Sequence, residues 1–204
     1  MTLKERDVTV GELPRAPVDS PAGSLLPVSC DAIGMERIPP RSVINLRGRP
    51  EDRGFVAAIK QAIHVELPVE PNTWTGDDGS RAAIWLGPDE WLVLAADGEA
   101  ASLEADMRAA LPGYDWLSVV DLSQNYTALR LSGSCARELL AKGCPLDLHA
   151  QAFAAGRCAQ TTLARTGVLL RVVDDAALEA WFRNSFADYT VRWLSDAAAE
   201  FLDQ

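Results

Sequence analysis

The sequence lacks a hydrophobic run long enough to cross a lipid bilayer. A membrane-spanning helix needs about 20 consecutive apolar residues, whereas this chain of 204 residues contains no such run and has a mean hydropathy of −0.01. The opening stretch, MTLKERDVTVGELPRAP, also lacks the apolar segment of a secretory signal peptide. The sequence therefore predicts a cytoplasmic protein that has no membrane partner.

Positive charge is scarce. The chain has 19 Lys and Arg residues against 29 Asp and Glu residues, which gives a net charge of −10. Proteins that bind nucleic acid by neutralising phosphates need the opposite balance. The composition therefore argues against a nucleic-acid partner.

Cysteine and histidine are also few, with four and two residues. No two cysteines have C-x-x-C spacing, and the histidines are far apart, so the usual signature of a zinc site is absent. Without an export signal, we expect the cysteines to be free thiols in the interior. The six residues are Cys30, Cys135, Cys144, Cys158, His64 and His149.

Recognisable catalytic motifs are missing as well. The chain has no dinucleotide-binding G-x-G-x-x-G after a strand, no phosphate-binding G-x-x-x-x-G-K-[ST] and no G-x-S-x-G nucleophile turn. Three acidic pairs, Asp77-Asp78, Asp89-Glu90 and Asp174-Asp175, fall in expected turns, where Asp bonds to nearby backbone. From the residues alone, we predict no catalytic site.

Lys142-Gly143-Cys144 allows two interpretations. The lysine could lower the pKa of the Cys144 thiol and make it reactive. The interpretation that we favour is a small apolar residue placed where a helix ends at Gly143.

Proline is concentrated at the start of the chain, where six of the twelve prolines lie. The same region has few periodic apolar positions, so residues 1–40 are expected to form an extended, irregular arm. Such an arm is either mobile or ordered by another surface. The six prolines are Pro14, Pro17, Pro21, Pro27, Pro39 and Pro40.

Regular patterns then occur in two successive rounds, residues 41–113 and 114–204. Each round has strand, helix, hairpin and helix in this order, which indicates an internal duplication. We therefore predict an α+β fold of two tandem ferredoxin-like βαββα-type halves that form one compact unit. The expected strands are 42–48, 82–86, 91–95, 116–122, 126–131, 157–164, 168–173 and 178–182, and the expected helices are 51–63, 98–111, 136–141 and 185–201.

Six tryptophans are many for this length. Core packing accounts for most of them, but tryptophan is also enriched at the centres of binding surfaces. The sequence does not distinguish these roles for Trp74, Trp85, Trp91, Trp116, Trp181 and Trp193.

Several motifs, in order, carry a resemblance to known families. Val120-Asp121-Leu122-Ser123, Leu129-Arg130-Leu131-Ser132-Gly133, Thr161-Thr162-Leu163 and Gly167-Val168-Leu169 resemble the folate-binding module of the glycine cleavage T-protein, an aminomethyltransferase. The gamma subunit of heterotetrameric sarcosine oxidase is more similar. It resembles this chain in Leu86-Gly87-Pro88-Asp89-Glu90-Trp91, in 142–148 (KGCPLDL) and in 183–187 (RNSFA).

This resemblance implies a non-catalytic accessory subunit. The assembly oxidatively demethylates sarcosine to glycine, and other subunits pass the one-carbon unit to tetrahydrofolate. The resemblance also implies the alpha, beta and delta subunits as partners, chiefly the large alpha subunit. FAD, FMN, NAD, zinc and tetrahydrofolate are then expected in those subunits, and no catalytic, cofactor or metal residue is expected in this chain.

The alternative is a free-standing folate-binding or one-carbon transfer domain, in which Asp121 and Arg165 would contact folate. The T-protein has a catalytic Asp in the strand after its second hairpin turn, whereas the matching stretch here has Arg171 and no carboxylate before Asp174. Asp121 ends a strand, where a structural role is expected. Related folate proteins of iron–sulfur metabolism carry Lys-Gly-Cys-Tyr, but Pro145 follows Cys144 here, so that role is not transferred.

Overall fold

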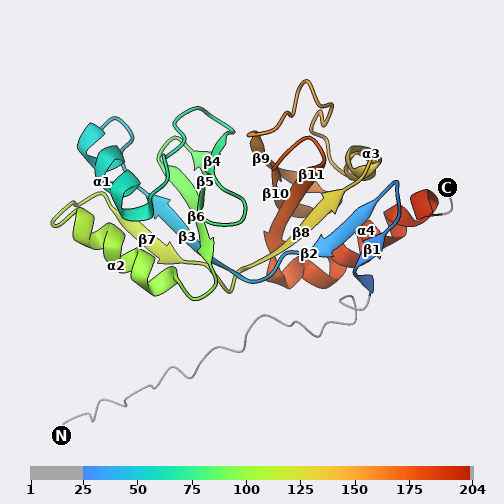
Figure 1. Cartoon of the computed structure of the whole chain (residues 1–204), viewed down its shortest axis with the longest axis horizontal. Coiled ribbons are helices and arrows are strands. Elements are labelled where there is room, and N and C mark those ends of the chain that lie inside the picture. The colour runs from blue at the N-terminus through green and yellow to red at the C-terminus, as the bar shows by residue number, and fades with distance from the viewer. Residues whose placement is uncertain (1–24, 203–204) are drawn as a thin grey trace, which may run out of the picture.

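The computed structural model describes residues 25–202, which form two antiparallel sheets and four α-helices (Figure 1). The strands are β1 (Val28–Ser29), β2 (Gly34–Arg37), β3 (Arg41–Arg47), β4 (Trp74–Gly76), β5 (Ala82–Gly87), β6 (Glu90–Ala96), β7 (Ser118–Asp121), β8 (Tyr126–Ser132), β9 (Cys158–Leu163), β10 (Thr166–Val172) and β11 (Ala177–Arg183). The helices are α1 (Arg53–Ile63), α2 (Ala100–Ala110), α3 (Ala136–Ala141) and α4 (Ala187–Leu202), the last preceded by a 3₁₀ turn, Asn184–Phe186.

Local sequence signals define α1. The Asp52 carboxylate accepts hydrogen bonds from the backbone N–H groups of Gly54, at 2.8 Å, and Phe55, at 3.2 Å, and so caps the helix start. His64 ends the helix in the left-handed conformation. Phe55, Ile59 and Ile63 recur at helical spacing and are all buried.

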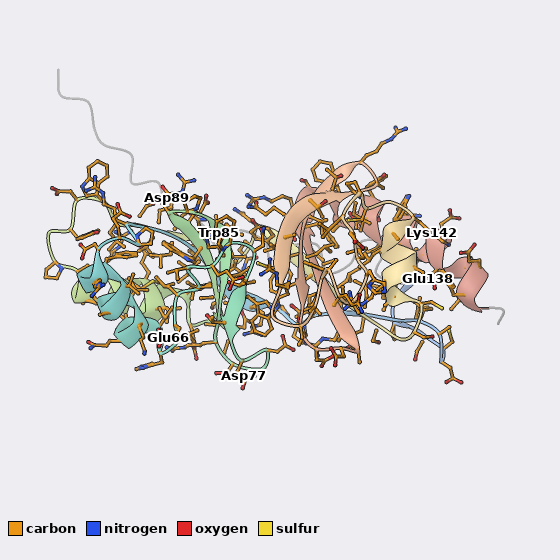
Figure 2. The ribbon with its side chains drawn as sticks, turned by 90° about the horizontal axis from the view of Figure 1, so that it is seen from above. Glu66, Asp77, Trp85, Asp89, Glu138 and Lys142 are labelled. Carbon is orange, nitrogen blue, oxygen red and sulfur yellow. The ribbon has the colours of Figure 1, made fainter. Side chains whose placement is uncertain are left out.

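The elements pack in four layers. The first sheet has the order β4-β5-β6-β3-β7, and α1 and α2 cover its outer face. The second sheet has the order β1-β2-β8-β11-β10-β9, and α3 and α4 cover its outer face. The inner faces of the two sheets meet in a third apolar core that includes Val43, Leu92, Leu169 and Trp181. Figure 2 shows the two halves side by side from above.

The two halves exchange an edge strand. Five strands of each sheet correspond in order, β4-β5-β6-β3-β7 in the first and β9-β10-β11-β8-β2 in the second. In sequence, β2 comes directly before β3 of the first sheet, but it pairs with β8 of the second sheet. Likewise, β7 comes directly before β8 of the second sheet, but it pairs with β3 of the first sheet. Each sheet is therefore completed by an edge strand that lies in sequence next to the strands of the other sheet.

The predicted α+β class and its paired halves are confirmed, and each predicted strand and helix from residue 41 onwards has a counterpart within a few residues. The predicted irregular arm, 1–40, differs in its described part. Residues 34–37 form β2, because Met35 is buried in the core and pairs with Leu131. Residues 1–24 lie outside the described part of the chain. The boundary predicted at 113/114 also does not separate the sheets, since β7 belongs to the first.

Gly133, between β8 and α3, has a positive φ of 94°, and a Cβ there would lie 2.5 Å from the Ala32 carbonyl oxygen. We expect Gly133→Ala to lower the free energy of unfolding by about 2 kcal/mol or more, because backbone strain and a clash with a rigid carbonyl add together. Gly113 is the matched control, since its φ is 72° but a Cβ there has no neighbour within 4 Å. Gly113→Ala should cost about 1 kcal/mol. Equal costs in urea unfolding would contradict the role assigned to Ala32.

No helix within residues 25–202 combines the length and apolar character that a membrane crossing requires.

Candidate functional site

A buried ion pair lies on the inner face of the second sheet. The side chains of Arg171 on β10 and Glu179 on β11 are 0% and 1% exposed. Arg171 Nε donates to Glu179 Oε2 at 2.6 Å, and the indole Nε1 of Trp181 donates to the same oxygen at 2.8 Å. Both oxygens of this carboxylate are occupied, because Arg130 Nη2 on β8 donates to Oε1 at 3.0 Å.

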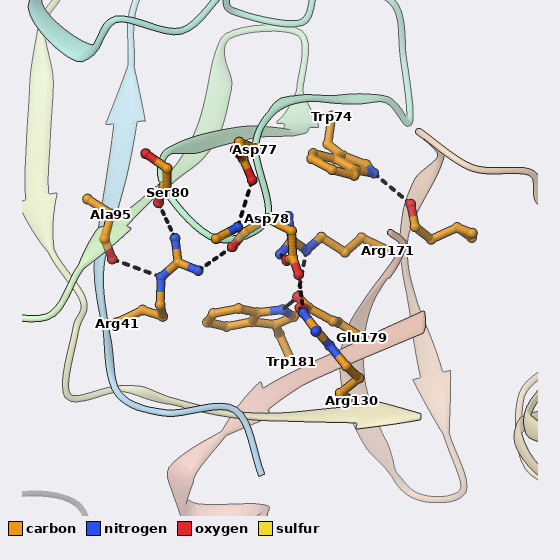
Figure 3. Close-up of polar contacts among 12 residues, drawn as sticks. Arg41, Trp74, Asp77, Asp78, Ser80, Ala95, Arg130, Arg171, Glu179 and Trp181 are labelled. Carbon is orange, nitrogen blue, oxygen red and sulfur yellow. Dashed lines mark hydrogen bonds and ion pairs between the residues drawn. The ribbon is translucent and has the colours of Figure 1, made fainter. Parts of the chain in front are cut away.

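The first half contributes Asp78, from the loop between β4 and β5. Its two carboxylate oxygens accept from Arg171 Nη2 and Arg130 Nη2 (Figure 3). The four charges therefore alternate in sign, and the two arginines lie between carboxylates from opposite halves. We call Asp78, Arg130, Arg171 and Glu179 the inter-half ion cluster.

Arg41 at the start of β3 fixes the loop that carries Asp78. Its Nε donates to the Ala95 carbonyl at 2.9 Å and its Nη1 to the Asp78 carbonyl at 2.7 Å, and its Nη2 bonds the Ser80 carbonyl. Figure 3 shows the bonds to Asp78 and Ser80 reaching the loop next to the cluster, and the bond to Ala95 joining Arg41 to β6. The loop position is thus set by backbone contacts, so that the Asp78 side chain points toward the second sheet.

Burial and neighbouring charge move the two carboxyl pKa values in opposite directions. Burial alone would raise the pKa of Glu179, but the hydrogen bond and charge of Arg171, with bonds from Trp181 and Arg130, lower it to about 2. The pKa of Asp78 is raised, by burial and then by the adjacent Glu179 carboxylate, against the opposing arginines. Glu179 is therefore ionised at neutral pH and serves as an acceptor, not as a proton donor.

The ion cluster has the chemistry of a structural lock. Its charged groups are engaged with one another, and it contains no nucleophile. Within residues 25–202, no group of three or more His, Cys, Asp or Glu side chains could hold a metal ion.

A cavity adjoins the cluster where the chain crosses between the halves. It measures about 70 Å³ and is lined by Arg37, Arg41, Asp97 and Trp181, among others. A wider groove shares Arg37, Arg41 and Asp97 and reaches Asp78 and Arg130. The cavity is smaller than the 300–1,000 Å³ or so that is common for ligand pockets, whereas the groove measures about 550 Å³.

The structure places Asp121 and Arg165 in different sheets. Asp121 ends β7, and its Oδ1 accepts from the backbone N–H and the hydroxyl of Ser123, at 2.8 and 2.5 Å. Arg165 is exposed in the turn between β9 and β10. The preceding residue, Ala164, donates its N–H to Gly143 beside α3. Among the described residues, no hydrogen bond or ion pair joins Asp121 to Arg165.

Lys142-Gly143-Cys144 lies at the end of α3. Lys142 Nζ pairs with Glu200 of α4 at 2.6 Å and lies 4.5 Å from the centre of the Phe201 ring. A Cβ on Gly143 would lie 2.5 Å from the Trp193 ring, so glycine allows α3 and α4 to approach. Cys144 is 7% exposed and packs in the apolar core between the second sheet and helices α3 and α4. These contacts agree with the helix-end interpretation of the motif.

Sequence reasoning missed most of the ion cluster. Asp78 lies in a turn as expected, but it also reaches across to Arg171, 93 residues away. Glu179 was not singled out, and Arg171 was considered only as a departure from the T-protein pattern. The available signal was a charged residue inside each apolar strand, as in Leu170-Arg171-Val172 and Leu178-Glu179-Ala180.

All four cysteines are free, and Cys144 and Cys158 are buried as expected, whereas Cys30 is exposed and Cys135 is half-buried. Burial raises the pKa of the Cys158 thiol to about 12, so about one thiol in ten thousand is ionised at pH 8.

We expect a maleimide to modify Cys30 rapidly at pH 8 and to leave Cys158 unmodified until the protein is denatured, because the thiolate is the reactive form. Peptide mass spectrometry after timed labelling measures both rates. Cys30→Ser is the control and should remove the fast reaction. Modification of native Cys158 as fast as Cys30 would contradict the prediction.

The tryptophans divide between core and surface. Trp91 and Trp181 are buried, Trp74, Trp85 and Trp193 are half-buried, and Trp116 is 60% exposed. Trp116 lies beneath the guanidinium of Arg49, at 3.7 Å from the ring centre. Core packing therefore accounts for most of them, and Trp116 is the exception.

Comparison with known proteins gives consistent matches over most of the chain. Residues 47–200 match the family described as "Sarcosine oxidase, gamma subunit family". The sequence is 40% identical over 164 residues to a sarcosine oxidase subunit gamma from Corynebacterium sp. (strain P-1), a match that covers 79% of this chain and 77% of that protein. It is 37% identical over 170 residues to one from Arthrobacter sp, with 83% and 82% covered.

Solved structures agree with these matches. A chain of the heterotetrameric sarcosine oxidase from Corynebacterium sp. U-96 has a TM-score of 0.82 and 34% identity, with 92% of this chain and 96% of that chain covered. The glycine cleavage system aminomethyltransferase T from Bartonella henselae has a TM-score of 0.57 and 15% identity, with 80% of this chain and 45% of that chain covered. The second match shows a shared fold alone.

Proposed function

The chain belongs to the sarcosine oxidase gamma subunit family, and we propose that it serves as a non-catalytic accessory subunit of a heterotetrameric sarcosine oxidase. The observation that carries this proposal is the match to a chain of the Corynebacterium assembly, at 34% identity over 96% of that chain. In this role, the protein supports an assembly that oxidatively demethylates sarcosine to glycine in the cytoplasm.

The contacts of the family-like motifs support an accessory role, since they are structural. In 86–91 (LGPDEW), Glu90 closes the β5–β6 hairpin and bonds Arg47 at 2.6 Å and Asn45 at 2.7 Å. In 183–187 (RNSFA), Asn184 accepts from the Thr127 hydroxyl and donates to the Gln124 carbonyl. These side chains shape turns and join elements, and so would hold a rigid surface for other subunits.

The proposal assigns the chemistry to the partners. The alpha, beta and delta subunits would hold FAD, FMN, NAD, zinc and tetrahydrofolate, and the other subunits would pass the one-carbon unit to tetrahydrofolate. We propose the large alpha subunit as the main contact of this chain.

Co-expression with the three other subunits, followed by native mass spectrometry, tests the proposal. We expect a complex containing one copy of each of the four chains, and a subcomplex with this chain when alpha is present and beta or delta is omitted. Recovery of this chain only as a monomer, beside an assembled complex of the others, would overturn the accessory role. Loss of the contact only when beta or delta is omitted would overturn alpha as the main partner.

A further inference from the structure

The first sheet is one strand shorter than the second. The five corresponding strands end with β7 in the first sheet and with β2 in the second. In the second sheet, β1 continues the order outside β2, with Val28 paired to Met35. Within residues 25–202, no strand continues the first sheet outside β7, which Figure 1 shows next to α2. The repeat therefore leaves β7 as a free edge where the other half has a further strand.

The backbone of β7 offers hydrogen-bonding groups at this edge. β7 is antiparallel to β3, and Leu122, just after β7, donates to the Val43 carbonyl at 2.7 Å. Because residues of an antiparallel pair alternate between bonded and non-bonded positions, Val119 and Asp121 direct their N–H and C=O groups away from β3. Nη2 of Arg108 on α2 donates to the Val119 carbonyl at 2.9 Å. A flexible side chain thus takes a bond that a neighbouring strand could supply.

Apolar side chains and a groove lie along the same edge. Trp116, two residues before β7, is exposed, and Val120 within β7 is 46% exposed. A groove of about 460 Å³ borders Trp116, Leu117 and Ser118. Tryptophan is enriched among the residues that contribute most to binding at interfaces. This edge therefore combines free main-chain groups with a side-chain groove, the two features that strand addition uses.

The charges around the groove indicate the chemistry of its partner. Of the two arginines in the lining, Arg47 pairs with Glu90 and Arg49 stacks on Trp116. Three exposed carboxylates also line the groove, and none has a salt bridge within the described residues. They are Glu51, Asp89 and Asp115. Lysine or arginine side chains would complement them, whereas residues 1–24 of this chain carry three basic and four acidic side chains.

We propose that residues 116–121, here called the docking edge, bind an extended, basic segment of another subunit, which adds a sixth strand to the first sheet. Its main chain would bond Val119 and Asp121 and replace the bond from Arg108. Its apolar side chains would contact Trp116 and Val120, and a lysine or arginine would face the three carboxylates. This inference rests on the proposed subunit role and assigns the surface through which that role is performed.

Hydrogen–deuterium exchange tests the added strand by comparing the isolated full chain with the four-subunit complex. We expect peptides that cover the docking edge to exchange at least about tenfold more slowly in the complex, because strand addition protects the N–H groups that face outward. Peptides that cover β9, the edge strand of the second sheet, are the internal control and should exchange equally in both states.

Two variants test the side-chain contacts. Each is co-expressed with the parent chain and the three other subunits, so that the two versions compete, and native mass spectrometry measures their ratio in the complex. We expect Trp116→Ala and Asp115→Lys to be at least about tenfold under-represented. The controls Val69→Ala and Asp175→Lys change exposed residues outside the docking edge and should enter as well as the parent. A thermal unfolding midpoint within ~2 °C of the parent identifies variants that remain folded.

Equal exchange of the docking edge in the free and assembled chain would overturn strand addition. Full incorporation of both Trp116→Ala and Asp115→Lys would overturn the surface. Slow exchange of the docking edge already in the isolated chain would also overturn the proposal, since this chain would then cover the edge itself. All three results leave the subunit role intact, because the parent is still found in the complex. Absence of the parent from the complex would overturn both the subunit role and the docking edge.

Discussion

Replacing Arg171 by methionine is expected to lower the free energy of unfolding by about 3–5 kcal/mol, the usual cost of removing one partner from a buried ion pair. Glu179 is 1% exposed and would be left with Arg130 and Trp181 as its donors. Asp78 would also lose one of its two arginine contacts. Urea unfolding followed by tryptophan fluorescence measures the change.

Two further variants distinguish the stability lost with the ion pair from the stability lost with side-chain packing. Arg183→Met is the matched control, since this arginine ends β11 on the surface, and it should cost less than about 1 kcal/mol. The double change of Arg171→Met with Glu179→Met should recover part of the lost stability, because both buried charges are removed together. A cost for Arg171→Met no larger than that of Arg183→Met would contradict the assignment of the cluster as an inter-half lock.

Trp91→Ala is expected to lower the free energy of unfolding by about 3–5 kcal/mol, as is usual when a large buried aromatic side chain is removed. Trp91 is fully buried in the core beneath α1 and α2, and its ring centre lies 6.0 Å from that of Phe55. Its indole N–H donates to the Pro68 carbonyl at 2.8 Å and so holds the loop after α1. The truncation therefore opens a cavity and frees a buried acceptor.

The same chain offers a second tryptophan as a control. Trp116 is 60% exposed, and its described contact is the stacked Arg49. Trp116→Ala should cost less than about 1 kcal/mol, the value of an exposed cation–π contact. Denaturant titration measures the loss of unfolding free energy in both variants. Nearly equal losses would show that Trp91 does not anchor the apolar core beneath α1 and α2.

The sequence predicted the fold well because its signals are local. Periodic apolar positions such as Phe55 and Ile59 mark α1, and the turn from Gly87 to Glu90 marks a hairpin. The strands β1 and β4 were missed because they have two and three residues, too few to show an alternating pattern. The strand β2 was missed because Met35 is its one buried residue. Their conformation is fixed by the strands beside them.

The site could not be predicted in the same way, because its members are far apart in the chain. Asp78 meets Arg171 across 93 residues, and Arg37 shares a cavity with Asp97. A sequence pattern shows that a charge stands in an apolar strand, but not which opposite charge faces it. That pairing depends on how the two sheets stack, which is a property of the tertiary structure.

The exchanged edge strands bear on how the protein folds. A chain cut at residue 113 would leave β3 without β7 in the first fragment, and β8 without β2 in the second. Neither fragment could complete its sheet, so each fragment expressed separately should be insoluble or unstructured. Mixing the two fragments should restore structure. The intact chain is expected to unfold in a single transition by both circular dichroism and fluorescence. The duplication would then have produced one folding unit made of two interdependent copies.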